Sequence, residues 1–378
     1  MDSSIGRGRT SALPWLATVR PVVEEVVRAQ GVPGVVIAVG RGDGLAEHLV
    51  VGGDAAGRPL AADTLLPVAS ITKLATALAT LRLAAAGAFA LDDPLARHLP
   101  DAAAAREGVN LRALLCHTAG LPDDVVAEAA PYEPGLDWPT LARACLATPL
   151  AARPRTRVRY SNVGPGLLAV LVERLTDQPF AAALSNVVLA PLGVEAYLGV
   201  EPPRPPARLA GDLGEHAGTD LEPFNSPFWR ALALPWGGLL TTAAGALGLV
   251  RAFAGVPAGF LPPALLAEAT RDQTGGLGGG FWDPLLWRRC PWGLGAELRG
   301  DKAPHWAPAE VAPASFGHAG ASGCLAWADP AADVAWAMLG SRFFADWWTT
   351  WPAIGAAILF AIGGPASTGQ PAPQAGGR

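Results

Sequence analysis

The sequence predicts an α/β protein in which an antiparallel sheet is formed by strands from both ends of the chain and the helices are segregated from it. Three observations lead to this class. β-Branched stretches near residues 32–52 have the pattern of a hairpin, the middle of the chain is dominated by helical patterns, and two further hairpin strands precede a closing helix.

The first predicted elements are a helix and a hairpin. Apolar residues recur at helical spacing from Leu16 to Val27, which predicts an amphipathic helix over residues 14–29. Residues 32–40 are rich in valine and isoleucine and end at a glycine, as in a strand. Residues 48–52 are the expected hairpin partner of that strand.

A serine and a lysine three residues apart, Ser70 and Lys73, stand at the start of the next predicted helix. One turn of a helix places both side chains on the same face. A lysine whose pKa is lowered by burial can take the proton of a serine hydroxyl and so create a nucleophile. The residues from Leu74 to Leu83 are apolar almost all round, which predicts a buried helix and an unusual buried cation.

Alone, this spacing is weak evidence for a catalytic pair, because S-x-x-K occurs by chance in most long proteins. Its alternative interpretation is a serine helix cap followed by a solvated lysine.

Helices are also expected over residues 111–120, 138–146 and 163–175, and a polar loop precedes the last of them. In that loop Tyr160 and Asn162 alternate, so they face the same side if the loop is extended. A tyrosine can relay a proton where a nearby cation lowers its pKa, and an asparagine can orient a substrate amide. The alternative is a helix cap made by Ser161 or Asn162, with Tyr160 in the core.

The carboxyl-terminal third carries small residues beside a few polar ones. Trp236 precedes two glycines and a Thr-Thr helix cap, and residues 291–298 have a strand pattern. Residues 315–323 surround His318 with glycine, alanine and serine, so that a ligand could lie against a strand edge. The alternative is a loop histidine with ordinary hydrogen bonds. Further strands are expected over 324–327 and 334–340, and a closing helix over 347–362.

Composition limits the function classes. The net charge of −5 argues against a nucleic-acid surface, and the apolar stretch 354–363 is too short to span a bilayer. No signal peptide is recognised after Met1, so we expect a cytoplasmic protein. The glycine-rich loop 275–280 follows no suitable strand, and the four cysteines lack metal-ligand spacing, so no cofactor and no metal are expected.

Cys116 beside His117 raises the possibility of a thiol enzyme. Neighbouring residues on a helix point in different directions, so structural roles are favoured for both.

Three motifs in one order are more specific than any of them alone. S-I-T-K at 70–73, Y-S-N at 160–162 and H-A-G at 318–320 resemble the penicillin-recognising serine enzymes. The similar groups are class C β-lactamases, D-alanyl-D-alanine carboxypeptidases, family VIII carboxylesterases and lovastatin-type acyltransferases. The resemblance extends from about residue 20 to 362, and L-L-C-H-T-A-G-L at 114–121 supports it.

This resemblance implies a β-lactamase/transpeptidase-like fold, with an antiparallel sheet flanked by helices and an inserted all-helical lobe. Residues 1–363 would form one catalytic domain of two lobes, followed by a disordered tail over 364–378. The α/β lobe would comprise residues 14–75 and 235–363, and the mainly helical lobe residues 76–234.

The resemblance also implies the roles of the site residues. Ser70 would be the acylated nucleophile, with Lys73 and Tyr160 as base and proton relay. Asn162, His318, Gly320 and Trp236 would bind substrate. Ala321 would do so as well, and its N–H and that of Ser70 would form the oxyanion hole. Many β-lactamases carry a lysine where this chain has His318, so recognition of a substrate carboxylate is not expected to carry over.

The expected function is acyl transfer through a Ser70 acyl-enzyme, on an ester or amide of a small molecule. The partners would be an acyl donor and an acceptor (water, an amine or an alcohol), with no nucleic acid and no membrane. The expected location favours an esterase or a transacylase, for example in antibiotic biosynthesis, over cell-wall work. The alternatives are a β-lactamase or D-Ala-D-Ala carboxypeptidase, and a non-catalytic ligand-binding module on the same fold.

Overall fold

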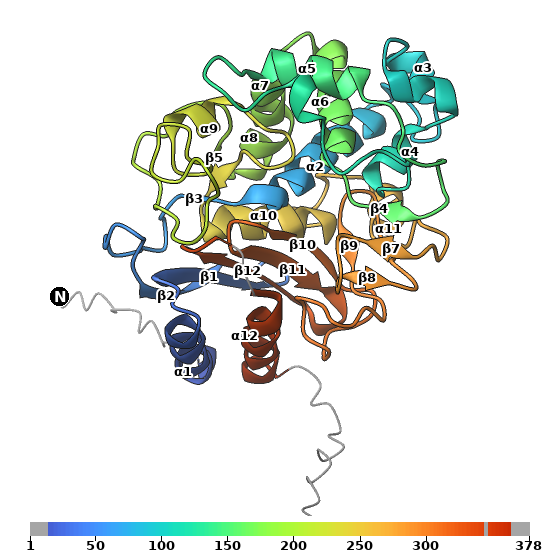
Figure 1. The fold of residues 1–378 in the computed structure, drawn as a ribbon. Helices are drawn as coiled ribbons and strands as arrows, with labels where there is room; N and C mark the ends of the chain where they lie inside the picture. Colours follow the sequence, from blue (N-terminus) through green and yellow to red (C-terminus); the bar gives the residue numbers. More distant parts are fainter. Residues whose placement is uncertain (1–13, 344–346, 364–378) are drawn as a thin grey trace, which may run out of the picture.

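The computed structural model describes residues 14–343 and 347–363. Its central feature is a six-stranded antiparallel sheet in the order β2-β1-β12-β11-β10-β9 (Figure 1). The strands of this sheet are β1 (Gly34–Arg41), β2 (Glu47–Gly52), β9 (Glu297–Leu298), β10 (Phe316–Gly320), β11 (Cys324–Asp329) and β12 (Val334–Gly340). β1 pairs with β12 from Val35 opposite Gly340 to Arg41 opposite Val334, so early and late strands are neighbours as predicted.

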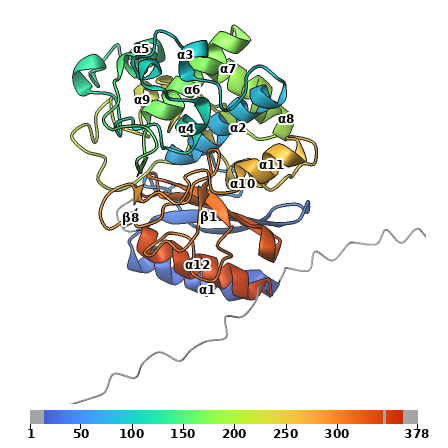
Figure 2. The ribbon, with the colours of Figure 1, turned by 90° about the vertical axis from the view of Figure 1, so that its right-hand side faces the viewer.

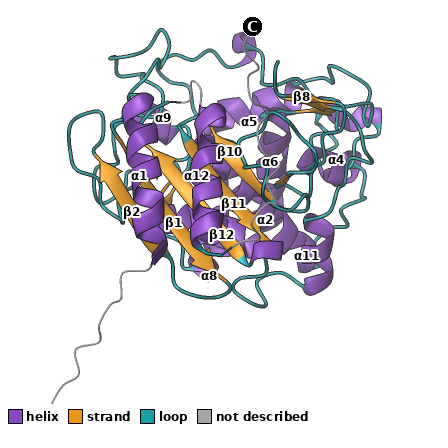
Figure 3. Cartoon of the chain, turned by 90° about the horizontal axis from the view of Figure 1, so that it is seen from below, coloured by secondary structure: helices purple, strands orange, loops and turns teal. Residues whose placement is uncertain are grey.

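Helices cover both faces of this sheet. α1 (Pro14–Ala29) and α12 (Trp347–Ala361) lie side by side across one face (Figure 3), and α10 (Ala243–Phe253) packs on the other against β1, β11 and β12. Along β1, Ile37 belongs to the core under α1 and α12, whereas Val36 belongs to the core on the α10 side. The sequence of a strand that is buried on both faces is a continuous apolar run, and β1 has such a sequence.

A mainly helical lobe lies above the α10 face (Figures 1 and 2). The remaining helices are α2 (Thr72–Ala85), α3 (Leu95–His98), α4 (Leu111–Leu115), α5 (Trp138–Ala147), α6 (Val163–Thr176), α7 (Phe180–Leu184), α8 (Ala190–Leu192), α9 (Pro227–Ala231) and α11 (Pro263–Ala269). Two small three-stranded sheets connect the lobes, one of β3 (Leu66–Pro67), β6 (Leu240–Thr241) and β5 (Ala196–Tyr197), the other of β4 (Val158–Arg159), β7 (Gly279–Gly280) and β8 (Leu286–Trp287). The predicted fold class is confirmed, but β4 and β5 add short strands to the inserted segment.

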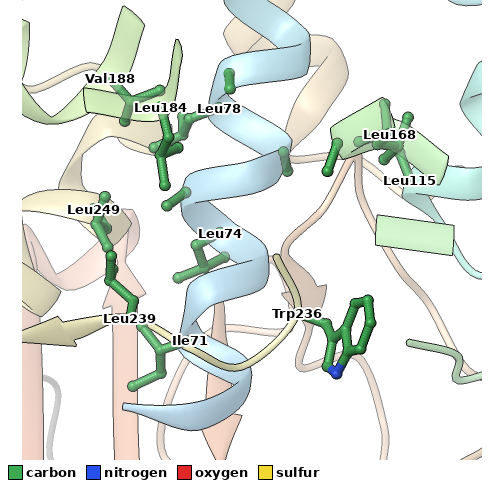
Figure 4. Close-up of a cluster of buried hydrophobic side chains, with 14 of the residues drawn as sticks. Ile71, Leu74, Leu78, Leu115, Leu168, Leu184, Val188, Trp236, Leu239 and Leu249 are labelled. Carbon is green, nitrogen blue, oxygen red and sulfur yellow. The ribbon is translucent and has the colours of Figure 1, made fainter. Parts of the chain in front are cut away.

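α2 is the buried helix that the sequence predicts. Every residue from Thr72 to Leu81 is buried. Figure 4 shows leucine and valine side chains around the helix, with Leu184 and Val188 on one side and Leu115 and Leu168 on the other. Each fully buried leucine contributes roughly 1.5–3 kcal/mol, so α2 is a rigid support for the residues at its amino-terminal end.

Two predicted elements differ in extent. The helix expected over 111–120 ends at Leu115, because His117 has a φ of +56° and therefore leaves the right-handed helical region. The strand expected over 291–298 is limited to Glu297–Leu298. Gly295 interrupts it with a φ of +103°, and a Cβ at that position would stand 2.1 Å from the Cβ of Ala77 on α2. The tail predicted over 364–378 lies outside the described residues.

Candidate active site

Ser70 lies in a single 3₁₀ turn, Ala69–Ile71, that leads directly into α2. Ala69 has a φ of +44°, a conformation that costs a non-glycine residue about 1–3 kcal/mol and persists only where its surroundings impose it. Thr72 supplies part of that constraint: its hydroxyl donates to the Ala69 carbonyl at 2.6 Å and accepts the Leu239 N–H at 3.0 Å. The turn is therefore fixed by the chain that precedes β6.

The Lys73 amine is buried within reach of the Ser70 hydroxyl. Its Nζ lies 3.1 Å from Ser70 Oγ, 2.8 Å from Asn162 Oδ1 and 3.0 Å from the Trp236 carbonyl oxygen. Burial lowers the pKa of Lys73 to about 7, and the charge of Asp124 partly opposes that shift. A neutral amine has two N–H bonds for the two carbonyl acceptors, which leaves its lone pair for the Ser70 proton. This is the geometry of a general base.

Tyr160 lies against the same amine. Its ring centroid is 4.7 Å from Lys73 Nζ, and its phenol is hydrogen-bonded to the Ser70 side chain. The nearby Lys73 amine does not lower the pKa of this phenol. Burial raises the pKa of Tyr160 well above its ordinary value, and the bond to Ser70 only partly offsets that rise. A phenol that stays protonated can pass a proton on but is no resting base.

Asn162 connects Lys73 to a carboxylate that the sequence did not reveal. Its Oδ1 accepts from Lys73, and its Nδ2 donates to Asp124 Oδ2 at 2.8 Å. Ser161, rather than Asn162, makes the cap-like bond at the start of α6, accepting the Val163 N–H at 3.1 Å. Asp124 stands in a loop with no pattern around it, so nothing in the sequence placed it here.

The end of β10 passes close to the Ser70 turn. A Cβ on Gly320 would stand 2.3 Å from the Val68 carbonyl oxygen, so only glycine allows this approach. Ala321 follows directly and is exposed. Ala321 is therefore the first residue after β10, and its N–H lies at the end of that strand, beside the turn that carries Ser70.

His318 is the buried imidazole of β10. Its Nδ1 donates to the Ala319 carbonyl at 2.6 Å, which leaves Nε2 as an unprotonated acceptor. Burial first, and the charge of Lys73 second, lower the pKa of His318 to about 4. The position therefore carries no positive charge near neutral pH.

Trp236 contributes its main-chain carbonyl, and not its indole, to the hydrogen bonds of the site. Its carbonyl accepts from Lys73, whereas its indole lies 6.2 Å from the ring of Trp138 and belongs to the core around α2 (Figure 4). Substrate binding by this side chain stays a prediction.

An aromatic wall stands behind Tyr160. We use this name for His117, Phe281 and Trp292, whose ring centroids lie 4.8, 4.4 and 5.9 Å from that of Tyr160. Phe281 comes into place because β4 and β7 pair in parallel, with Arg159 opposite Gly280, so the residues that follow them emerge together. Sequence reasoning missed Phe281 and Trp292, since such a pairing of two-residue strands leaves no pattern.

The cysteine beside His117 has a separate environment. Cys116 Sγ lies 3.2 Å from the Thr118 hydroxyl, and burial raises the pKa of its thiol. His117 Nδ1 instead accepts the Ser161 N–H at 3.3 Å. These contacts favour structural roles and give the thiol no activating base.

Neither a metal centre nor a membrane-spanning helix is found within residues 14–343 and 347–363. In these ranges, no group of three or more His, Cys, Asp or Glu side chains is arranged to hold a metal ion. In the same ranges, no helix has the length and apolarity needed to cross a membrane.

The chain is similar in sequence and in fold to known proteins. The family model described as Beta-lactamase matches residues 19–357. Esterase EstB of Burkholderia gladioli is 33% identical over 254 residues, which is 58% of this chain and 64% of EstB. Protein flp of Staphylococcus aureus (strain N315) is 30% identical over 129 residues, 33% of this chain and 26% of flp. The chain thus matches less than two thirds of the length of these curated relatives.

Solved structures agree with the fold. A beta-lactamase from Mycobacterium bovis is 28% identical with a TM-score of 0.65, covering 90% of this chain and 99% of that chain. A penicillin-binding protein homologue from Caulobacter crescentus has a TM-score of 0.72 at 24% identity, covering 93% of this chain and 99% of that one. EstCE1, described as a hydrolase with promiscuous acyltransferase activity, has a TM-score of 0.71 at 21% identity, covering 91% of this chain and 98% of its own.

Proposed function

The chain belongs to the beta-lactamase family, and from that premise we propose that it is a serine hydrolase that forms an acyl-enzyme at Ser70 on a small ester. The observation that carries the proposal is the position of Lys73. Its amine lies 3.1 Å from Ser70 Oγ, and its other two hydrogen-bond neighbours are carbonyl oxygens.

In the proposed acylation, the neutral Lys73 amine takes the Ser70 proton while Oγ attacks the ester carbonyl. The oxyanion is stabilised by two N–H groups, that of Ser70 at the start of α2 and that of Ala321 at the end of β10. As the tetrahedral intermediate collapses, the Tyr160 phenol gives its proton to the leaving alcohol and takes up the proton that Lys73 received from Ser70, so both groups return to their starting states. Deacylation repeats these transfers with water in place of Ser70 Oγ.

Esters without a carboxylate are the favoured substrates because His318 is neutral. Penicillins and D-Ala-D-Ala peptides carry a carboxylate that calls for a cation, and the neutral imidazole of His318 does not supply one. The similarity to esterase EstB supports the same choice. The β-lactamase and carboxypeptidase activities are therefore the second candidates.

Transfer of the acyl group to an amine or alcohol is a finer form of the same proposal, including a role in antibiotic biosynthesis. Promiscuous acyltransferase activity is ascribed to EstCE1, which shares the fold. Adding an alcohol during ester turnover tests it: a transacylase yields the new ester, whereas a hydrolase yields only the acid.

The main test compares p-nitrophenyl butyrate with a chromogenic cephalosporin, using the full chain and its Ser70→Ala variant. We expect turnover of the ester, a mass increase of one butyryl group on the Ser70 peptide, and loss of both in the variant. Preferred turnover of the cephalosporin would support the β-lactamase alternative. Activity that survives Ser70→Ala would reject the proposed function, and absence of turnover and adduct would favour the non-catalytic binding module.

A further inference from the structure

Three ionisable side chains are completely buried at the end of the sheet nearest the site. Lys302 Nζ lies 2.6 Å from Glu297 Oε1, and His305 Nε2 lies 3.3 Å from the same oxygen, with none of the three side chains exposed. Glu297 is the β9 residue paired with Gly317, next to His318 on β10. We call these three residues the buried charge cluster.

The buried charge cluster is in contact with the aromatic wall. Lys302 Nζ donates to the Pro291 carbonyl at 3.1 Å and lies 5.3 Å from the ring centroid of Trp292, the next residue. The Trp292 ring in turn lies 4.8 Å from His117 and 5.9 Å from Tyr160. Among the described residues, Trp292 Nε1 is buried without a hydrogen-bond partner, so no bond of its own fixes the indole.

Such an ion pair is a poor device for stability alone. Taking two charges out of water carries a large free-energy cost, and apolar residues of similar volume are often as stabilising. What the pair provides is a fixed position for the ammonium, which is bonded to the Glu297 carboxylate and the Pro291 carbonyl and lies 4.9 and 5.3 Å from the ring centroids of Trp287 and Trp292.

We propose that Lys302, held by Glu297, is a positioning residue for Tyr160: it fixes Trp292, and Trp292 with His117 fixes the phenol against Ser70. The inference rests on the proposed function, because it assigns Lys302 an effect only through the proton relay. A phenol displaced by about 1 Å is no longer in place to pass a proton beside Ser70, which can cost up to a hundredfold in rate.

The test is a double-mutant cycle on the full chain with p-nitrophenyl butyrate. Lys302→Met is expected to lower kcat about tenfold or more with little change in KM, because the relay and not substrate binding is disturbed. In a Tyr160→Phe background the same change is expected to cost less than about twofold, because residues that act as one unit are not additive. Lys302→Arg, which keeps the charge, is expected to restore most of kcat.

Lys302→Met leaves Glu297 buried without its counter-charge, so the paired variant Glu297→Gln/Lys302→Met is measured as well. It removes both charges and is expected to fold, to lower kcat, and to lose that effect in the Tyr160→Phe background. Arg230→Met is the matched control: it breaks the ion pair at 2.7 Å to Glu201 in the helical lobe and is expected to leave kcat unchanged.

Each outcome has a separate meaning. A kcat loss of equal size with and without the Tyr160 hydroxyl, or unchanged kcat in both charge-removing variants, overturns the positioning role and leaves the proposed function standing. Full activity of Tyr160→Phe itself, or of Ser70→Ala, overturns the proposed function, and the positioning role falls with it.

Discussion

Lys73 is the residue on which the chemistry depends, and its environment is made by three separate segments. α2 supplies the apolar burial, the loop before α6 supplies Asn162, and the segment before β6 supplies the Trp236 carbonyl. Burial alone would make the amine neutral, but the two carbonyl acceptors also aim it. As a consequence, the lone pair of the neutral Lys73 amine is directed at Ser70.

The first prediction concerns pH. Lys73 must be neutral to act as a base, so kcat/KM for an ester is expected to rise with pH and level off with a midpoint of about 7. Asp124 raises the pKa of Lys73, so Asp124→Asn is expected to move the midpoint to lower pH. The neighbouring change Asp123→Asn is the control, since that carboxylate accepts from Arg159 instead. Equal midpoints in all three proteins would contradict this assignment.

The second prediction concerns His318. Replacing it by lysine is expected to place a cation beside the site and to lower KM for an ester that carries a carboxylate. A charge-assisted hydrogen bond contributes about 1.5–3 kcal/mol, so the expected change is roughly tenfold or more. The neutral ester of the same acyl group is the control substrate. If His318→Lys improves both esters alike, or neither, charge at this position does not set specificity.

At the scale of elements, the site depends on how closely β10 approaches the Ser70 turn. Gly320→Ala would place a Cβ 2.3 Å from the Val68 carbonyl oxygen, so strand or turn must move. We expect a free energy of unfolding lower by about 1–3 kcal/mol and a loss of kcat, measured by urea denaturation and ester turnover. Gly237→Ala is the structural control, since its Cβ would meet nothing within 4 Å. Equal stability of both variants would show that the approach is not tight.

Elements also show what the sequence could and could not predict. The α1 helix has a helical periodicity and the β1–β2 hairpin is rich in β-branched residues, and both stand where expected. Ser70, Lys73, Tyr160 and Asn162 could be predicted as one site because their motifs occur in the order of a known family, although each motif alone is weak. Phe281 and Asp124 were missed, because one depends on a two-residue parallel pairing and the other on a loop conformation. Neither leaves a periodic pattern in the sequence.

At the scale of the whole molecule, the central sheet combines strands from the two ends of the chain, with β1 and β12 as neighbours. Trp336 in β12 is fully buried, opposite Val39 of β1 and Trp327 of β11. Trp336→Ala is expected to lower the free energy of unfolding by about 3–5 kcal/mol. Ser70 and Lys73 stand at the start of α2, whose apolar core is separate from the one that contains Trp336, so kcat/KM of the folded protein should change little. A large loss of kcat/KM with full stability would reverse this expectation.

A neutral buried lysine is what would make Ser70 a nucleophile in the proposed reaction. The most direct measurement is the rate at which an activated phosphonate ester labels the Ser70 peptide, followed by mass spectrometry across the neutral pH range. We expect labelling at Ser70, with a rate that rises to a plateau around a midpoint of about 7. Labelling at another residue, or a Ser70 rate that does not change across this pH range, would contradict it.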